Sequence, residues 1–357
     1  MNTALLLALL VPAADTVPAP DVRDNVSRGL KWLADQQKTD GSWDAPNGLS
    51  RSLITARAGS ALLMEGSTTS TGNYAPNLRK AAAWFAAQTP ASGRLGGNNP
   101  TETQVSTLSQ AHALVFLVSV HDAETDAVRA KEQAALLTKA VEFALAARTS
   151  VGGWSQGVPR DFGDSTDTQS TAEMLSALLI ARKAGVAVPR NVVERAMRIL
   201  ETVTTSDGGL GFYNGPAAVR PAGGGNAYAS ASGAALALTS GDVRPAPLPG
   251  WVRHARRGLG NYERTLPQQG YFSLQQTLAF ARVAYALGEG GHNRLDEADD
   301  SVQVVWSRER AKLFKAVVGL QKADGSWPDQ FGAPAYATAL ALTTLQLDNG
   351  YLPAFTR

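Results

Sequence analysis

The stretch LADQQKTDGSW, residues 33–43, recurs almost unchanged as VVGLQKADGSW, residues 317–327. Each copy ends a helical pattern, turns on Asp-Gly and then places a tryptophan, which is Trp43 in the first copy and Trp327 in the second. A segment that recurs near both ends of a chain of 357 residues indicates an internal repeat, because repeat proteins reuse one supersecondary unit.

Weaker copies of the same turn lie between these two. They read SGRLGG, SVGGW, SDGGLGFY and QQGYF, and the residue that follows each turn marks one unit. These marker residues are spaced 52, 59, 58, 60 and 55 residues apart, so six units fill the chain from about residue 24 to residue 349. In order, the six markers are Trp43, Leu95, Trp154, Phe212, Phe272 and Trp327.

A second repeat follows each turn, in which a threonine precedes a leucine by seven residues. Seven residues are two helical turns, so both side chains face the same side of a helix. The pairs are Thr55–Leu62, Thr107–Leu114, Thr171–Leu178 and Thr338–Leu345, with Thr277–Ala284 in unit five and Ser230 or Ser232 as the hydroxyl residue of unit four.

Each unit therefore contains two kinds of helix. The first is amphipathic, as in residues 26–37, and the second is rich in small residues and nearly free of charge, as in residues 228–241 and 336–347. A helix that is apolar all round is buried on every side, and small residues let such helices approach closely. The sequence predicts an all-α fold, an (α/α)6 toroid of six helical hairpins with an inner and an outer ring, forming one domain over residues 20–357.

The Asp-Gly-Ser-Trp turn has a local explanation. Gly41 and Gly325 are predicted to be the left-handed residues that end an outer helix, a conformation that only glycine adopts without cost. The following Trp43 and Trp327 are predicted to pack back between neighbouring hairpins.

With Gln36 or Gln37 in the first copy and Gln321 in the last, the turn resembles the QW repeat of squalene and hopene cyclases. The six alternating hairpins are similar to the toroid shared by those cyclases, protein prenyltransferase β subunits and complement thioester domains. The resemblance covers nearly all of the chain after residue 20. It implies the fold more strongly than any activity, because one fold hosts many functions.

The resemblance also locates a missing acid. The cyclases carry D-x-D-D-T-A at the start of an inner helix, and the middle aspartate protonates the substrate. The matching stretch here is DTQSTA, residues 167–172, which keeps Asp167 but places Gln169 at the position of that acid. An amide has no proton that titrates in the useful range, so the sequence does not support protonation of an alkene by these residues.

Metal and thiol chemistry have no support in the sequence. Protein prenyltransferases hold zinc with Asp, Cys and His, and the thioester domains need a cysteine, but this chain has none. Its histidines show no metal-ligand spacing, so neither a metal nor another cofactor is predicted. The four histidines are His112, His121, His254 and His292, of which His112 alone falls within an inner-helix pattern.

Candidate ligand-binding residues gather at the predicted starts of inner helices. Asp164 and Asp167 allow two interpretations: they cap a helix, or they form a carboxylate pair of the kind that serves glycoside hydrolysis. Together with one histidine from an inner helix, the candidate cavity residues are Asp164, Asp167, Gln169, His112, Gln275 and Gln276.

Composition and the N-terminus set further bounds. A net charge of +2 gives no reason to expect nucleic acid as a partner, and no continuous apolar stretch of about 20 residues predicts a membrane span. Residues 4–11, ALLLALLV, followed by PAADTVPAP, resemble a signal peptide over residues 1–19, although no Lys or Arg precedes them. A periplasmic or secreted protein without disulfides is therefore expected.

Three functions remain open on the sequence. The first is an exported protein that binds an isoprenoid-like or other elongated apolar ligand in the central cavity of the ring, or a peptide or glycan at its polar rim. The second is an enzyme, either an isoprenoid cyclase or transferase or a carbohydrate-active toroid that uses Asp164 and Asp167. The third is an interaction scaffold of the cell envelope. The sequence does not indicate an oligomeric state.

Overall fold

The computed structural model describes most of the chain. The predicted signal peptide, residues 1–19, lies outside the described residues. These are residues 20–44, 50–97, 102, 106–158, 164–211, 214–215, 224–241, 244–266, 270–290, 295, 303–329 and 332–352.

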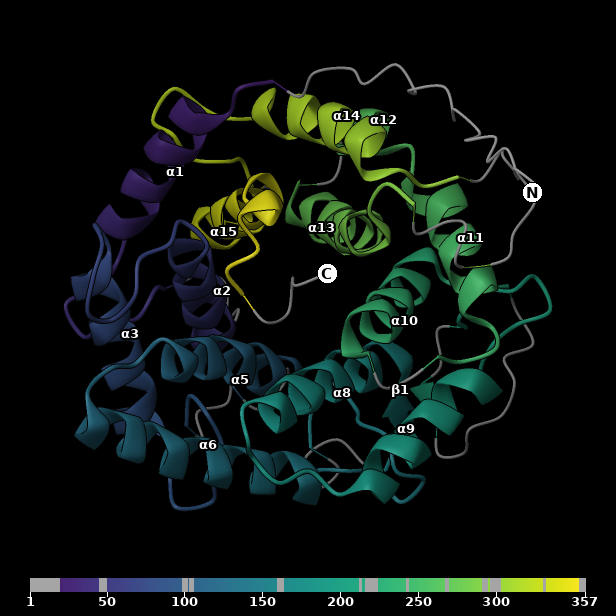
Figure 1. The fold of residues 1–357 in the computed structure, drawn as a ribbon, viewed down its shortest axis with the longest axis horizontal. Coiled ribbons are helices and arrows are strands. Elements are labelled where there is room, and N and C mark those ends of the chain that lie inside the picture. The colour runs from purple at the N-terminus through teal and green to yellow at the C-terminus, as the bar shows by residue number, and fades with distance from the viewer. Residues whose placement is uncertain are drawn as a thin grey trace, which may run out of the picture.

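Figure 1 shows two concentric rings of helices, with an outer and an inner helix in each of six units. This arrangement confirms the predicted (α/α)6 toroid. The outer helices are α1 (Arg23–Asp35), α3 (Ala75–Gln88), α6 (Ala127–Ala146), α9 (Arg190–Thr202), α11 (Leu248–Leu259) and α14 (Trp306–Val318). The inner helices are α2 (Arg51–Leu63), α5 (Ser106–Asp122), α8 (Thr168–Lys183), α10 (Ala227–Ser240), α13 (Gly270–Leu287) and α15 (Pro334–Leu345).

Smaller elements join these helices. A short helix α12 (Tyr262–Thr265) precedes α13, and a 3-10 helix η5 (Leu347–Asn349) follows α15. Strand β1 (Thr166–Asp167) pairs antiparallel with β2 (Asn214–Gly215) next to the start of α8. Among the helices that the structure describes, none is long and apolar enough to cross a bilayer.

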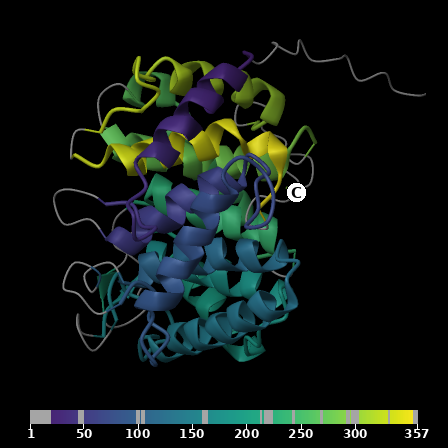
Figure 2. The same ribbon diagram turned by 90° about the vertical axis from the view of Figure 1, so that its left-hand side faces the viewer.

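The ring closes where its first and last units meet. Helix α15 packs against α1 and α2, and Figures 1 and 2 both show α1 and α15 side by side. A reciprocal amide contact joins the same units. Gln321 Nε2 donates to the Asn25 carbonyl at 2.8 Å, and Asn25 Nδ2 donates to Gln321 Oε1 at 2.7 Å. The first and last units are therefore held together by packing and by hydrogen bonds.

The tryptophan after the turn ties an outer helix to the inner helix that follows. Trp43 donates its backbone N–H to the Thr55 hydroxyl at 3.1 Å and its indole N–H to the Leu33 carbonyl at 2.7 Å. The indole rings at these positions are fully buried, as predicted. The equivalent backbone contacts are Trp154 to Thr171 (3.0 Å) and Trp327 to Thr338 (3.0 Å).

Unit two departs from the predicted register. The backbone N–H of Leu95 donates to Gln110 Oε1 at 2.8 Å, rather than to Thr107. The longer amide side chain reaches the turn from almost one helical turn further along α5. Thr107 and Leu114, which the sequence repeat pairs on one face of the helix, are both buried, but Thr107 does not accept the turn N–H.

In unit four the turn is held by a serine. The backbone N–H of Leu210 donates to Ser230 Oγ at 2.9 Å, so Ser230 rather than Ser232 occupies the threonine position. Leu210 therefore takes the marker place that was predicted for Phe212. Phe212, like the side chain of the unit-five marker Phe272, lies outside the described part of the chain.

The turn glycines are left-handed, but they do not end a helix. Helix α1 ends at Asp35, whereas Gly41 lies in the following turn with φ of 94°. The predicted left-handed conformation of the glycine is therefore confirmed, but the prediction that it ends the helix is wrong. A Cβ on Gly41 would lie 2.3 Å from the Lys80 carbonyl oxygen, and one on Gly325 would lie 2.7 Å from that of Arg28. Glycine is required because the neighbouring hairpin approaches this closely.

Candidate functional site

Asp167 caps the start of α8. Its Oδ1 accepts the backbone N–H of Ser170 at 2.6 Å, which confirms the capping interpretation. The side chain is buried, and Oδ2 has no hydrogen-bond partner among the described residues. Burial raises the pKa of this carboxyl above its usual value, so it holds a proton more readily than a solvated aspartate.

Asp164 lies in a different environment. It is exposed, and its Oδ1 accepts the backbone N–H of Ser150 at 2.7 Å. Hydrogen bonds from Ser150 lower the pKa of Asp164. The two carboxylates therefore differ in exposure, in partner and in the direction of their pKa shift, which leaves Asp167 as the better placed proton donor of the two.

The predicted glutamines lie near the starts of two inner helices. Gln169 is in the first turn of α8, and Gln275 and Gln276 are in the second turn of α13. All three are partly buried. Their role in ligand binding stays a prediction.

A cluster of charged and hydrogen-bonding side chains lies on the inner helices, and we call it the axis cluster. Every inner helix contributes at least one member. Its members are Arg57 of α2, His112 of α5, Glu173 of α8, Tyr228 and Ser232 of α10, Arg282 of α13 and Tyr336 of α15.

Contacts within the cluster show that its side chains point toward the axis of the ring. Ser232 Oγ donates to Glu173 Oε1 at 3.1 Å, and Arg282 Nη1 lies 3.4 Å from Glu173 Oε2. Helix α10 lies between α8 and α13 in the ring, as Figure 1 shows. Glu173 and Arg282 meet only because both side chains reach inward past it.

His112 is a neutral acceptor in this cluster. Burial, together with the nearby charges of Arg57 and Arg282, holds the pKa of His112 well below its usual value. Arg57 Nη2 lies 2.9 Å from His112 Nε2. Because a guanidinium only donates, Nε2 must accept, which places the histidine proton on Nδ1. His112 is thus a member of the cluster, as its inner-helix pattern suggested.

The charges of the cluster do not balance among the described residues. Two guanidiniums, Arg57 and Arg282, face one carboxylate, Glu173. Tyr228 stays uncharged because burial and the nearby Glu173 raise its pKa well above the usual value. The charged members and His112 each keep 7 % or 8 % of their surface accessible, so solvent reaches them.

The sequence did contain a signal for this cluster. Four members lie two residues after the side chain that accepts the turn N–H, and they interrupt helices that are otherwise nearly free of charge. The sequence indicated His112 as a candidate cavity residue and Ser232 as a possible hydroxyl of unit four, but its patterns did not single out Arg57 and Glu173. The four are Arg57 after Thr55, His112 after Gln110, Glu173 after Thr171 and Ser232 after Ser230.

A serine, a histidine and an aspartate also meet elsewhere. Ser230 Oγ lies 3.4 Å from His254 Nδ1, and His254 Nε2 lies 3.4 Å from Asp207 Oδ2. The Ser230 hydroxyl already donates to the Asn226 carbonyl at 2.7 Å and accepts the turn N–H, and it is fully buried. Its arrangement therefore serves the turn and not nucleophilic attack. Within the described ranges, no three His, Asp or Glu side chains converge as metal ligands.

No family model and no curated protein sequence matches this chain. Solved structures with the same fold do match. One is an inactive double Asp-to-Asn variant of the α-1,6-mannanase GH76A of Salegentibacter sp. HEL1_6 in complex with α-1,6-mannotriose. It has a TM-score of 0.56 and 10% identity, over 92% of this chain and 99% of that one.

Two further structures come from different enzyme classes. A variant of the type II terpene cyclase MstE from Scytonema has a TM-score of 0.51 and 17% identity, over 93% of this chain and 98% of that one. The unsaturated glucuronyl hydrolase of Bacillus sp. GL1, described as responsible for the degradation of glycosaminoglycan, has a TM-score of 0.57 and 14% identity, over 90% and 95%. These similarities establish the six-hairpin α/α toroid. The function has to be argued from the residues of the site, because this fold hosts different activities.

Proposed function

We propose that this protein binds an elongated saccharide inside the ring, from the starts of the inner helices to the axis cluster. The axis cluster is the observation that carries the proposal. It presents guanidinium, carboxylate, imidazole and phenol groups from five inner helices to the solvent that reaches them, with the more deeply buried Tyr336 of the sixth beside them. Such a surface suits a ligand that has many hydroxyl groups, each of which both donates and accepts hydrogen bonds.

The same cluster disfavours the isoprenoid-like ligand that the fold resemblance suggests. An apolar chain next to Arg57, Glu173 and Arg282 would displace water from these charges and return no hydrogen bond, which is costly. Two of the similar structures are described as carbohydrate-active enzymes, one of them with a bound trisaccharide. Their descriptions support a saccharide as the ligand class to test first.

Calorimetric titration of the purified protein tests the proposal. The panel holds neutral oligosaccharides such as α-1,6-mannotriose, uronate oligosaccharides, and the isoprenoid alcohol farnesol. Saccharide binding is expected, with weakened affinity in Glu173→Gln and unchanged affinity in the control Glu194→Gln, whose side chain lies on outer helix α9. Binding of farnesol alone would overturn the proposal, and so would the absence of binding by every saccharide.

A second candidate function is glycoside hydrolysis with Asp167 as the general acid. It is favoured by the burial of this carboxyl, its raised pKa and the unpartnered Oδ2. Asparagine also caps helices well, so Asp167→Asn removes the acid while it keeps the helix start. We expect Asp167→Asn to abolish the release of reducing ends from a bound oligosaccharide and Asp164→Asn to retain it. A wild-type protein that binds saccharides without turnover is a binding protein only.

We also propose export to the periplasm or the medium, on the apolar run and small-residue zone of residues 1–19. Expression of the full chain in a bacterial host followed by mass spectrometry of the mature protein tests this. A protein that stays in the cytoplasm with residues 1–19 intact would contradict it.

A further inference from the structure

Arg57 is a buried cation without a counter-ion among the described residues. Arg57 is 8% exposed, and among the described residues its side chain hydrogen-bonds to the neutral His112. No described carboxylate lies within ion-pair distance of it, and its Nε has no hydrogen-bond partner in the described part of the chain. A buried charge with no partner of opposite sign is costly for the folded state.

Two other arginines lie beside carboxylates. Arg282 lies 3.4 Å from a carboxylate oxygen of Glu173, and Arg256 lies 3.3 Å from one of Glu309. A neutral imidazole cannot take the place of such a carboxylate, because it accepts one N–H and carries no charge. The absence of a described counter-ion therefore distinguishes Arg57 from Arg282, the other guanidinium of the axis cluster.

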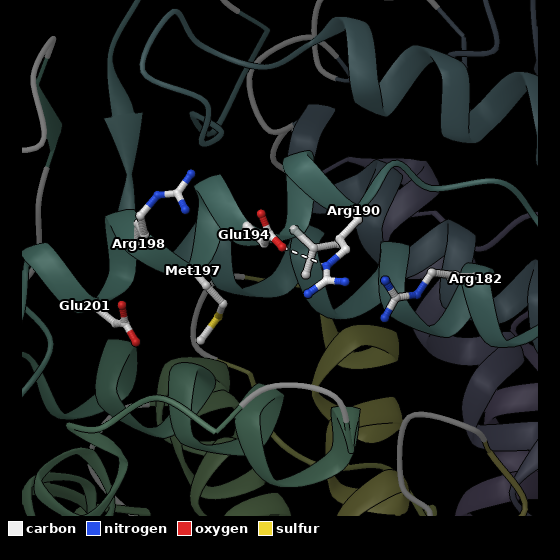
Figure 3. Close-up of a pocket in the computed structure, with 7 residues that line it drawn as sticks. Arg182, Arg190, Glu194, Met197, Arg198 and Glu201 are labelled. Atoms are coloured by element: carbon white, nitrogen blue, oxygen red, sulfur yellow. Dashed lines mark hydrogen bonds and ion pairs between the residues drawn. The ribbon is translucent and has the colours of Figure 1, made fainter.

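A surface groove with several cationic side chains lies along outer helix α9, as Figure 3 shows, and anions alternate with the cations there. Arg190 is exposed and already pairs with Glu194 at 2.7 Å. Such exposed, paired charges give little binding energy. The residues that line the groove are Arg182, Arg190, Val193, Glu194, Met197, Arg198 and Glu201.

We propose that Arg57 binds a carboxylate carried by the ligand, so that the saccharide held in the ring is a uronate. The inference rests on the proposed function and specifies its substrate class. Arg57 has no described carboxylate within ion-pair distance, so its one positive charge matches the one negative charge of a ligand carboxylate. The planar fork of a guanidinium fits a carboxylate in a bidentate manner. The backing His112 fixes one Nη by accepting its N–H and adds no competing negative charge.

Pairs of saccharides that differ only in their carboxyl groups test the proposed contact between Arg57 and a ligand carboxylate. The probes are a trigalacturonate and a hyaluronan tetrasaccharide, each compared with its own carboxyl-reduced form, together with sulfated and phosphorylated derivatives of the reduced trisaccharide. A bidentate, charge-assisted contact is expected to favour the carboxylate form of at least one pair by roughly 10- to 100-fold in Kd. The sulfate and phosphate arms separate carboxylate recognition from general attraction of anions.

Two substitutions assign the preference to Arg57. Arg57→Met is expected to bind both members of the pair with the affinity of the reduced form, and Arg57→Lys is expected to keep part of the preference, since lysine keeps the charge and loses the fork. The control Arg190→Met should keep the wild-type preference. Because Arg57→Met removes an unpaired buried charge, its melting temperature without ligand should equal or exceed that of the wild type.

The outcomes separate the inference from the proposed function. Equal binding of carboxylate and reduced forms by the wild type overturns the inference and leaves saccharide binding intact. Binding of neither form overturns the inference alone if another saccharide of the calorimetric panel binds, and it overturns both if none does. The inference is also overturned if Arg57→Met still prefers the carboxylate form over the reduced form. The same holds if the wild type prefers the sulfated or phosphorylated derivative over the reduced form by as much. If Arg57→Met does not fold, Arg57→Lys decides: a reduced preference supports the contact, and an unchanged one contradicts it.

Discussion

At the scale of single residues, the environment decides what a side chain does. His112 lies in the sequence SQAHALVF, which is typical of a packed inner helix. In the fold it is buried beside two guanidiniums, which come from α2 and α13, and burial together with these charges lowers its pKa and keeps it neutral. Asp167 and Asp164 are three residues apart, yet burial raises the pKa of one and hydrogen bonds lower that of the other.

The neutral state of His112 predicts a loss of stability in acid. The unfolded chain has a histidine pKa near 6.5, and the folded state has a lower one. Below about pH 6.5 the unfolded state therefore takes up a proton that the folded state does not, and the free energy of unfolding falls as the pH falls. In His112→Gln the difference between urea unfolding at pH 8 and at pH 5.5 should be smaller than in the wild type. His121→Gln is the control and should keep the wild-type difference.

Replacing a turn glycine with alanine is expected to lower stability through two separate effects, backbone strain and a steric clash. Gly185 and Gly325 both have positive φ, of 88° and 95°, but a Cβ on Gly185 would meet no atom within 4 Å. Gly185→Ala should therefore cost about 1–2 kcal/mol from backbone strain alone. Gly325→Ala should cost more, since its Cβ would also press on the Arg28 carbonyl. If chemical denaturation shows equal losses of unfolding free energy for the two variants, the close approach of Gly325 to the Arg28 carbonyl does not affect stability.

At the scale of elements, the hairpin is held by a contact that propensities do not describe. An outer helix stops, a five-residue turn follows, and the next backbone N–H is accepted by a side chain of the inner helix. A hydroxyl serves in units one, three, four and six, and an amide serves in unit two. The repeated feature is a side-chain oxygen that accepts the turn N–H. Whether threonine, serine or glutamine supplies it depends on how far the side chain must reach from the inner helix to the turn.

Removing one acceptor should loosen one hairpin. Thr338→Val keeps the shape of the side chain but leaves the buried Trp327 N–H without its partner, which should cost about 1–3 kcal/mol. Thr343→Val is the matched control, because that buried hydroxyl only donates back to the Ala339 carbonyl of its own helix at 2.7 Å. Guanidinium unfolding measures both. A loss at Thr338 no larger than that at Thr343 would contradict the role of the turn contact.

At the scale of the whole molecule, closure of the ring couples units that are far apart in the chain. Unit six joins unit one through α15 and through the amide pair of Gln321 and Asn25. Closure also brings together Arg57, Glu173 and Arg282, which come from three different units. A ring that opened between its ends would lose part of the axis cluster as well.

Ring closure predicts that a change in the last unit is felt in the first. Gln321→Ala removes side-chain contacts to Asn25 and to the Gly325 carbonyl. Amide hydrogen exchange should then rise in α1 as well as in the turn of unit six, since both lose a partner. An increase confined to residues 319–329 would show that the two ends do not stabilise each other.

The sequence by itself determined the number of units, the two layers and the buried tryptophans. These follow from local chemistry: helical periodicity, left-handed glycines and a turn whose Trp43 and Trp327 contacts repeat within about a dozen residues. Only the tertiary structure decided the Gln110 register and the axis cluster. Arg57, Glu173 and Arg282 are more than a hundred residues apart in the sequence. Their side chains interact only because the closed ring of six inner helices brings them to one axis.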